Sequence, residues 1–247
     1  MASNADRKLS GKIALVTGGS RGIGRAVAAA YARQGAGVLI CARNGADVDR
    51  AVADIRSSGG EAHGCVGDVG DDQQVKAIAR ATREWFDRLD ILVNNASALG
   101  PRVAIPEYPL SSWQEVVRVN LTGSLLMIQE ALKFMIPQRQ GSIINVSSGV
   151  GRVGKARWGA YAVSKFGIEG LTQVLADEVR QLGIRVNAVN PGPTKTEMRA
   201  RAYPDEDPLT LPTPDDVTPV FVHLACDDSA GVTGQSLEAQ EWLKQAN

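Results

Sequence analysis

A tyrosine and a lysine four residues apart, in the segment Tyr161-x-x-x-Lys165, are spaced to do proton chemistry. In a helix this spacing puts both side chains on one face, one turn apart. A free tyrosine keeps its proton up to a pKa of about 10, so a nearby cation is needed to favour the phenolate at neutral pH. Lys165 is placed to be that cation, and the Ser148 hydroxyl to hold a carbonyl or alkoxide oxygen. The three residues predict a site that protonates a ketone oxygen while another group delivers hydride.

The composition narrows the class of protein. A chain of 247 residues with 44% hydrophobic content is long enough for an ordinary domain with a large core. Lys plus Arg and Asp plus Glu balance at 27 each, which argues against nucleic acid or an anionic membrane as the main partner. No apolar run approaches the ~18 residues of a spanning helix, and residues 1–9 lack the apolar core of a signal peptide. We therefore expect a cytoplasmic protein that acts on a small molecule.

Cysteine and histidine are too sparse for several common kinds of site. Cys41, Cys65 and Cys226 are odd in number and lack C-x-x-C spacing, which predicts reduced thiols rather than disulfides or a metal site. The two histidines, His63 and His223, share no motif with each other or with a carboxylate. A Ser-His-Asp hydrolase and a histidine-ligated metal are therefore not expected.

A glycine-rich turn near the N-terminus is placed to bind a dinucleotide. The apolar run 12–17 predicts a buried strand, 25–34 a helix and 37–41 the next strand. Glycines between a strand and a helix let the backbone approach a pyrophosphate, and the helix N-terminus supplies free N–H groups. A tight structural turn is the alternative, but the β-α-β context favours dinucleotide binding. The residues concerned are Gly18, Ser20, Arg21, Gly22, Ile23 and Gly24.

The end of the second strand distinguishes NAD from NADP. An acidic residue there would bind the ribose hydroxyls of NAD and repel a 2′-phosphate. This sequence has Ala42 and Arg43 instead, with Arg21 as a second guanidinium inside the glycine turn. Arginine binds phosphate through a fork of donors, although a solvated surface charge is a common alternative. Two arginines with the acid missing predict NADP(H).

The alternation of strand and helix continues to the C-terminus. It predicts an α/β protein with a single Rossmann-type, doubly wound parallel sheet of about seven strands and helices on both faces, in one domain over residues 1–247. Residues 1–10 are expected to be a loose extension. Residues 195–214 lack a clear period and are rich in proline and acids, which predicts a substrate lid or, alternatively, a mere connector. The remaining strands are expected at 61–66, 89–93, 142–146, 184–189 and 234–239.

Asp68 lies in the turn that follows the third predicted strand. Its carboxylate is placed to accept a hydrogen bond from an adenine amino group. The alternative is that it caps the helix of residues 71–87, a role for which Asp71 competes.

Three asparagines also have both a binding and a structural interpretation. Asn94 and Asn95, at the end of the fourth predicted strand, fit loop anchoring and cofactor contact equally well. Asn120 lies inside a helix expected from residue 111 to 135, where asparagine is a mediocre residue. It therefore predicts a specific hydrogen bond, unless it simply faces solvent.

Taken together, the motifs resemble the short-chain dehydrogenase/reductase family over nearly the whole chain, from residue 12 to 237. They are Thr17-Gly-Gly-Ser-Arg-Gly-Ile-Gly24, Asn94-Asn-Ala-Ser97, Asn120, Ser148, Tyr161-x-x-x-Lys165 and Asn190-Pro-Gly-Pro193, in this order. The resemblance implies that Tyr161 is the general acid/base, and that Lys165 lowers its pKa and binds the nicotinamide ribose. It also implies that Ser148 polarises the substrate oxygen and that Asn120 holds a water of the proton relay.

The resemblance implies further cofactor contacts. Asn94, Asp68 and Val69 would line the path of the adenosine and its ribose. The turn after the sixth strand would meet the nicotinamide through Pro191, Gly192 and Thr194, with the Thr194 backbone at the carboxamide edge. Hydride would pass between the nicotinamide C4 and a carbonyl carbon while Tyr161 handles the proton.

The chain also departs from the family pattern. Ser97 replaces the glycine that usually follows Asn-Asn-Ala, and Glu238-Ala239 follows the last strand in place of Asp-Gly-Gly. Family members are commonly dimers or tetramers built on the helices here expected around 111–136 and 160–182. Closest in pattern are the 3-oxoacyl-carrier-protein reductases and related bacterial reductases.

Three functions follow from these observations. The leading one is an NADPH-dependent reductase of a carbonyl substrate, such as a 3-oxoacyl thioester. A non-catalytic NADP-binding redox sensor or assembly module is the second, although it would not need Ser148, Tyr161 and Lys165 together. An NAD-dependent alcohol dehydrogenase is the third, and the missing acid at Ala42 counts against it.

Overall fold

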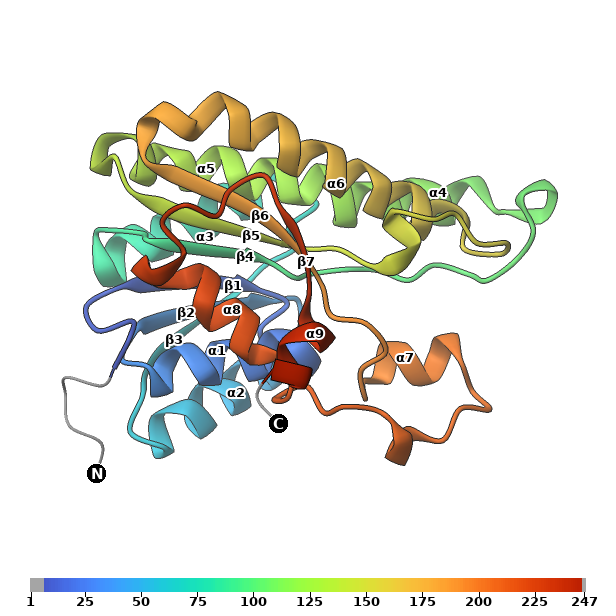
Figure 1. Ribbon diagram of the computed structural model, residues 1–247, viewed down its shortest axis with the longest axis horizontal. Coiled ribbons are helices and arrows are strands. Elements are labelled where there is room, and N and C mark those ends of the chain that lie inside the picture. Colours follow the sequence, from blue (N-terminus) through green and yellow to red (C-terminus); the bar gives the residue numbers. More distant parts are fainter. Residues whose placement is uncertain (1–6, 246–247) are drawn as a thin grey trace.

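Seven parallel strands form the centre of the protein (Figure 1), in a computed structural model that describes residues 7–245. The strand order is β3-β2-β1-β4-β5-β6-β7, and every neighbouring pair is parallel. The predicted doubly wound sheet is therefore confirmed. The strands are β1 (Ile13–Thr17), β2 (Gly37–Ala42), β3 (Glu61–Val66), β4 (Ile91–Asn94), β5 (Gly141–Val146), β6 (Ile184–Asn190) and β7 (Ser236–Glu238).

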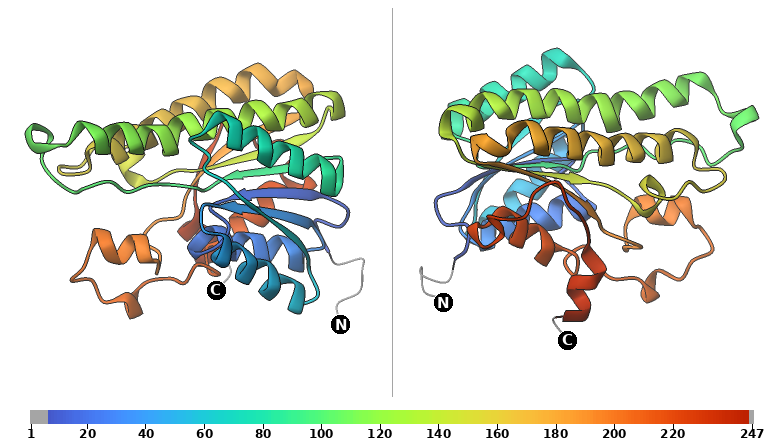
Figure 2. Two further views of the ribbon diagram at one scale, coloured as in Figure 1. Left: turned by 180° about the vertical axis from the view of Figure 1, so that it is seen from behind. Right: turned by 45° about the horizontal axis from the view of Figure 1, so that its top comes forward.

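Helices cover both faces of the sheet (Figure 2), which explains why the central strands are continuous apolar runs. Apolar residues of α1, α2 and α8 pack on one face, and those of α3, α5 and α6 on the other. The helices are α1 (Gly22–Arg33), α2 (Gly45–Ser57), α3 (Asp72–Phe86), α4 (Leu110–Val117), α5 (Gly123–Gln138), α6 (Gly159–Val179), α7 (Glu197–Ala202), α8 (Thr218–Ala225) and α9 (Ala239–Gln245).

The order of the strands places a ligand crevice. The chain winds outward from β1 to β3 and then returns to β4 on the other side of β1. Open α/β sheets bind ligands at such a reversal, outside the carboxyl ends of the strands. The glycine turn after β1, the loop after β4 and the residues after β5 all lie at that end. The topology thus brings the predicted cofactor and catalytic motifs to one edge.

The helix expected from residue 111 to 135 differs in detail. It begins at Leu110, passes through a π-helical segment, Arg118–Thr122, and ends at Gln138. The wider π-turn contains Asn120. A π-bulge inserts an extra residue in a helix and is frequent at functional sites, but its hydrogen-bond pattern has no periodic sequence signal.

The remaining differences lie near the chain ends and in the expected lid. Residues 1–6 of the predicted extension lie outside the described residues, but Leu9 is fully buried and so is not loose. The segment 195–214 contains helix α7 (Figure 1). Helix α9 begins at Ala239, so the last strand is shorter than expected. Within residues 7–245, no helix is both long and apolar enough to cross a membrane.

Candidate active site

Tyr161, Lys165 and Ser148 meet where β5 ends and α6 begins. Ser148 lies close enough to the Tyr161 hydroxyl to lower its pKa. Nζ of Lys165 lies 5.5 Å from the centroid of the Tyr161 ring and donates a 2.7 Å hydrogen bond to the carbonyl oxygen of Val146. The tyrosine and the lysine lie one helical turn apart, as their spacing predicts, and both are buried. The structure therefore assembles the three side chains that the sequence singled out.

Burial sets the protonation of this group. It raises the pKa of Tyr161 to about 12, against a smaller opposite effect of the Ser148 hydrogen bond. Burial also lowers the pKa of Lys165 to about 8, against the opposing charge of Glu169. The sequence predicted that Lys165 lowers the pKa of Tyr161. In this structure burial of the hydroxyl raises that pKa, and the opposing effect comes from Ser148. At neutral pH the tyrosine is therefore a proton donor and the lysine a cation.

Asn120 makes the specific hydrogen bonds that its position in a helix predicted. Its Oδ1 accepts from the backbone N–H of Ala98 at 2.7 Å, and its Nδ2 donates to the carbonyl oxygen of Ala98 at 3.0 Å. Nδ2 also lies 3.0 Å from Oγ of Ser164, on the catalytic helix. The side chain is buried and does not face solvent. It joins the loop after β4 to α6, and its expected role in holding a water stays a prediction.

Three glycines of the turn after β1 occupy positions that disfavour a side chain. Gly18 and Gly22 have φ of +63° and +54°, a region that favours glycine. A Cβ on Gly24 would lie 2.4 Å from the carbonyl oxygen of Gly18. Helix α1 has neither a capping side chain nor an acidic residue in its first turn, so its N–H groups and positive dipole end suit an anion. Ser20 and Ile23 lie in the same turn, partly buried.

The two arginines predicted to bind a 2′-phosphate contact different carboxylates. NH1 of Arg21 lies 2.6 Å from Oε2 of Glu197, on α7. NH1 of Arg43 lies 3.6 Å from Oε1 of Glu115, on α4. Both guanidinium groups are largely exposed, with 65% and 66% of their side-chain area accessible. The sequence missed both acidic partners, because they come from segments far along the chain.

Asp68 is bound within the protein rather than capping a helix. Its Oδ1 accepts from the backbone N–H of Gly70 at 2.9 Å, and its Oδ2 lies 2.8 Å from NH2 of Arg118. Asp71 is the residue that caps α3, accepting from the backbone N–H of Gln74. Val69, beside Asp68, is buried. The alternative of an Asp68 cap is therefore wrong, and its contact with adenine stays a prediction.

Asn94 and Asn95, at the end of β4, differ in their contacts: one anchors a loop, and the other has an acceptor atom left for a ligand. Nδ2 of Asn95 donates to the carbonyl oxygens of Thr17 and Gly18 at 2.9 and 3.1 Å, so Asn95 anchors the glycine turn. Asn94 donates to Asn145 at 2.9 Å, while its buried Oδ1 has no partner among the described residues. A buried acceptor without a donor costs free energy, and a ribose hydroxyl would satisfy it. With the side-chain-free cradle at Gly18 and Gly24, this atom makes the site fit a dinucleotide.

The turn after β6 is held in shape by its neighbours. Gly192 has a φ of +68°, and Thr194 is buried, its hydroxyl bound to the carbonyl oxygen of Gly192 at 3.2 Å. Pro191 is also buried. Nε2 of Gln240, on α9, donates to the carbonyl oxygen of Pro193 at 2.7 Å. Helix α9, which the sequence did not predict, thus supports the turn expected to meet the nicotinamide.

An aromatic cluster that the sequence did not predict lies beside Tyr161. The Trp158 ring centroid is 5.5 Å from that of Tyr161 and 5.9 Å from that of Tyr203, on the segment 195–214. The Arg102 guanidinium lies 4.7 Å from the Trp158 ring and 4.8 Å from the Tyr203 ring, and also donates to the carbonyl oxygen of Ala202. The predicted lid is therefore attached next to Tyr161.

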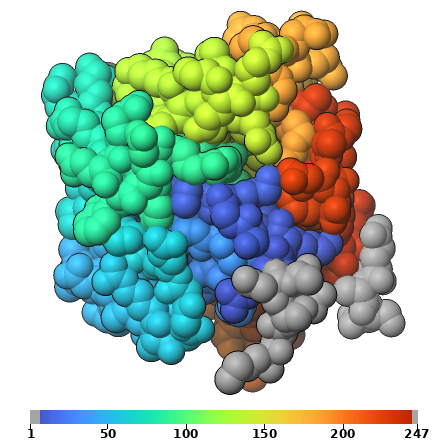
Figure 3. Space-filling model, turned by 90° about the vertical axis from the view of Figure 1, so that its left-hand side faces the viewer, coloured from blue at the N-terminus to red at the C-terminus, as the bar shows by residue number. Residues whose placement is uncertain are grey.

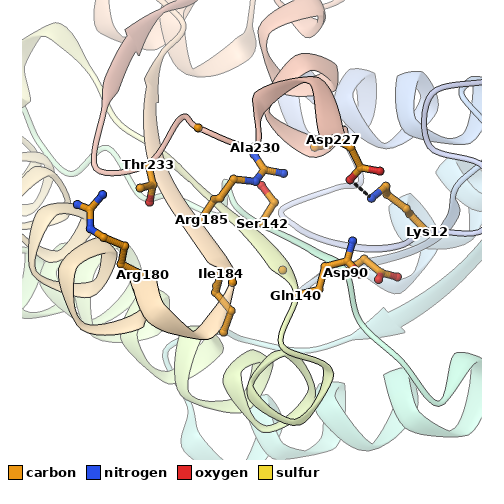
Figure 4. Close-up of a pocket in the computed structure, with 14 residues that line it drawn as sticks. Lys12, Asp90, Gln140, Ser142, Arg180, Ile184, Arg185, Asp227, Ala230 and Thr233 are labelled. Carbon is orange, nitrogen blue, oxygen red and sulfur yellow. Dashed lines mark hydrogen bonds and ion pairs between the residues drawn. The ribbon is translucent and has the colours of Figure 1, made fainter.

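The best-defined cavity lies at the opposite end of the strands. Figure 3 shows the side of the molecule where the strands begin, at which early, middle and late parts of the chain meet. The cavity has a volume of about 410 Å³, and Figure 4 shows the residues that line it. Its charged groups have partners within the protein: Arg185 donates to the carbonyl oxygen of Leu224 at 2.7 Å, and Nζ of Lys12 lies 2.7 Å from the Asp227 carboxylate. It contains none of the predicted site residues.

The comparisons with known proteins agree with this geometry. The family model described as short chain dehydrogenase matches residues 12–207. The chain belongs to the short-chain dehydrogenase family. This dehydrogenase is 40% identical over 239 residues to the uncharacterized oxidoreductase YciK of Escherichia coli K12, covering 96% of this chain and 94% of YciK. It is 35% identical to the 3-oxoacyl-carrier-protein reductase FabG of Aquifex aeolicus, covering 92% and 95% of the two chains.

A solved relative extends the comparison to the cofactor. The short-chain dehydrogenase of E. coli CFT073 in complex with NADPH has 39% sequence identity and a TM-score of 0.91, covering 95% of this chain and 99% of that one. The predicted membership of the family is therefore confirmed. The dehydrogenase is an NAD(P)-dependent oxidoreductase of the class that acts on CH–OH and C=O groups.

Proposed function

We propose that the protein is an NADPH-dependent carbonyl reductase in which Tyr161 protonates the substrate oxygen. The observation that carries the proposal is the buried Tyr161 side chain, beside Ser148 and one helical turn from the buried Lys165, whose Nζ lies 5.5 Å from the tyrosine ring centroid. A phenol with a pKa of about 12 holds its proton at neutral pH and is in the acid form that reduction requires. Bound NADPH supplies the hydride.

The other side chains position the substrate oxygen and hold charge. Ser148 donates a hydrogen bond to the substrate carbonyl oxygen, which makes the carbonyl carbon more electrophilic. The Lys165 ammonium stabilises the phenolate that remains when Tyr161 has given up its proton, and it binds the nicotinamide ribose. Asn120 fixes the loop after β4 against α6 and extends the proton relay through a water.

The choice of NADPH rests on the 2′-phosphate. Arg43 follows β2 where an acid would select NAD, and both Arg43 and Arg21 are exposed enough to exchange a carboxylate for a phosphate. The solved relative contains NADPH. The Asn94 acceptor, Asp68 and Val69 bind the adenosine, and the turn of Pro191, Gly192 and Thr194 meets the nicotinamide.

The substrate class we favour is a 3-oxoacyl thioester or a similar ketone. FabG of A. aeolicus, a 3-oxoacyl-carrier-protein reductase by name, is among the relatives that cover nearly the whole chain. Residues 195–214 act as the lid, since Tyr203 reaches the aromatic cluster beside Tyr161. We place the enzyme in the cytoplasm.

We further propose that the enzyme is a homo-oligomer, a dimer or a tetramer. Helix α6 is buried on its sheet side yet exposes Val163, Phe166 and Val174, and α5 exposes Leu125. Contiguous apolar helix faces of this kind are typical of subunit contacts. Light scattering on a size-exclusion column tests the oligomeric state, and the double substitution F166E/V174E is expected to yield monomers.

The function is tested by following NADPH and NADH oxidation with a panel of 3-oxoacyl thioesters, diketones, quinones and keto sugars. We expect turnover with NADPH that falls by about 10²–10⁴-fold in Tyr161→Phe, the usual contribution of a general acid. The matched control is Tyr31→Phe, which removes a buried hydroxyl far from the site, on α1. NADPH binding without turnover by any substrate would favour the redox sensor, and turnover with NAD and alcohols alone would favour the dehydrogenase direction.

A further inference from the structure

A third ionisable residue lies on the catalytic face of α6. Glu169 follows Lys165 by four residues and Tyr161 by eight, so the three side chains stack along one side of the helix. Glu169 is only 8% exposed. A buried carboxylate is costly unless it is paired and hydrogen-bonded. Glu169 should therefore have partners that compensate for the burial of its charge.

The Glu169 carboxylate joins three elements at the end of the sheet. Its Oε1 accepts hydrogen bonds from Oγ of Ser147, at the end of β5, and from Oγ of Ser236, on β7, at 2.9 Å. Nε of Arg152, in the loop after β5, lies 3.5 Å from the same oxygen. Ser147 directly precedes Ser148, so Glu169 holds the strand end that carries the substrate-binding hydroxyl.

From Arg152 the network continues to the turn after β6. The Arg152 guanidinium donates to Glu238 and, at 2.6 Å, to Ser236. Oε2 of Glu238 accepts from Nδ2 of Asn190 at 2.7 Å, and Oδ1 of Asn190 accepts from the backbone N–H of Gly192 at 3.0 Å. Glu238 stands where the family pattern has Asp-Gly-Gly. One chain of polar contacts thus links α6 to the turn expected to meet the nicotinamide.

We propose that Glu169 is a positioning residue of the catalytic site: its carboxylate balances the Lys165 ammonium and, through Ser147, fixes the strand end that carries Ser148. The proposal rests on the proposed function, since it explains how the reductase site is kept ready. Glu169 touches no reacting atom and acts only through its neighbours.

The charges around Lys165 agree with this role. Burial lowers the pKa of Lys165 to about 8, and Glu169 is the charged group that acts in the opposite direction. The β5 side offers only neutral partners, the carbonyl oxygen of Val146 and the serine hydroxyls. Tyr161, on α6 itself, is protonated at neutral pH because its pKa is raised to about 12. From the loop after β5 and from β7, the facing charges are Arg152 and Glu238. Arg152 pairs with Glu238 and, at 3.5 Å, also with Glu169.

The decisive experiment compares pH profiles of kcat/KM for NADPH-dependent reduction by the full-length enzyme and Glu169→Gln. Activity requires the lysine cation, so the rate falls where Lys165 loses its proton. Removing the opposite charge is expected to move this alkaline limb down by about one pH unit. Glu169→Asp, which keeps the charge, is expected to retain the limb. A limb at the same pH in Glu169→Gln and the wild type would overturn the proposal.

Two matched variants separate charge from packing. Ser236→Ala removes a hydrogen bond to the same carboxylate oxygen without changing any charge, and the limb is expected to stay in place. Ser147→Ala is expected to lower kcat several-fold with an unchanged limb, because Ser148 is less well held. If Ser236→Ala moves the limb as far as Glu169→Gln does, Glu169 is merely structural and the proposal fails.

A second readout does not need turnover. In NMR spectra of protein labelled with ¹⁵N-lysine, the Lys165 signal is assigned as the one that is absent from the Lys165→Met variant. Following this signal as the pH is varied gives the pKa of Lys165 directly. The pKa is expected to be lower in Glu169→Gln than in the wild type, and an equal pKa would overturn the proposal. A wild type that titrates as expected but reduces no substrate would contradict the proposed function alone.

Discussion

The Arg43 guanidinium lies 3.6 Å from the Glu115 carboxylate and so connects the end of β2 to helix α4. Glu115 is itself held by Arg118, whose Nε is 2.8 Å away. A cofactor 2′-phosphate at the end of β2 has to compete with Glu115 for Arg43. We therefore expect the carboxylate to oppose the binding of the phosphorylated cofactor.

Replacing Glu115 by glutamine is expected to tighten NADPH binding and to leave NADH binding unchanged. Exposed ion pairs are worth about 0.2–1 kcal/mol, so the dissociation constant is expected to fall by at most about 5-fold. Arg43→Ala is the opposing variant and is expected to weaken NADPH binding by about 10-fold or more, through loss of a charge-assisted contact. Fluorescence titration of both cofactors measures the four changes. Equal effects on NADPH and NADH would place the 2′-phosphate elsewhere.

The pKa values of the catalytic pair predict the pH dependence of reduction. Lys165 has a pKa lowered to about 8 and acts as a cation, so kcat/KM is expected to fall as pH rises through about 8. Tyr161, with its pKa raised to about 12, keeps its proton throughout that range and adds no limb there. Initial rates between pH 6 and pH 10, with the stability of the protein checked at each pH, test the expectation. A rate that rises with pH would mean that a deprotonated group is required.

The packing of the glycine turn predicts the effect of adding a single methyl group. In Gly24→Ala the new Cβ would lie 2.4 Å from the carbonyl oxygen of Gly18 and also 2.4 Å from Nδ2 of Asn95. These two atoms are hydrogen-bonded to each other and anchor the turn. We expect a loss of thermal stability together with a large loss of NADPH affinity. Gly170→Ala, on α6, is the control, because a Cβ added at this position would meet no other part of the protein within 4 Å. It is expected to stabilise the protein by about 0.5–1 kcal/mol.

Arg102 attaches the segment 195–214 to the rest of the site. It donates to the carbonyl oxygen of Ala202, and its guanidinium lies 4.7 Å from the centroid of the Trp158 ring and 4.8 Å from that of the Tyr203 ring. Arg102→Gln is expected to free the segment, to raise KM more than it lowers kcat, and to speed cleavage by chymotrypsin after Tyr203. The Arg199 guanidinium also lies over the Tyr203 ring, 3.8 Å from its centroid. Arg199→Gln is therefore the variant with which Arg102→Gln is compared, since it removes a different cation from the same ring. Unchanged cleavage in Arg102→Gln would show that the segment is held by other contacts.

Local patterns were enough to predict the sheet and the proximity of Tyr161 and Lys165. A buried parallel strand is an apolar run, and the spacing of Tyr161 and Lys165 fixes their common helix face, so both can be inferred from neighbours along the chain. The spacing of Glu169 from Lys165 gives the same signal. A carboxylate on a helix is usually solvated, however, so the spacing alone does not predict that Glu169 is buried.

Other features depend on which distant segments meet, and no local pattern contains that information. Glu115 and Glu197 contact the two candidate phosphate-binding arginines, and Trp158 and Tyr203 gather beside Tyr161, only because the chain folds back on itself. The pKa of Tyr161 is the clearest case. Its sequence neighbourhood predicts a lower value from the adjacent lysine, whereas desolvation, which depends on every atom packed around the ring, raises it. The sequence is thus sufficient to single out the candidate groups, whereas their environment follows only from the tertiary structure, because burial and long-range contacts are properties of the packed chain.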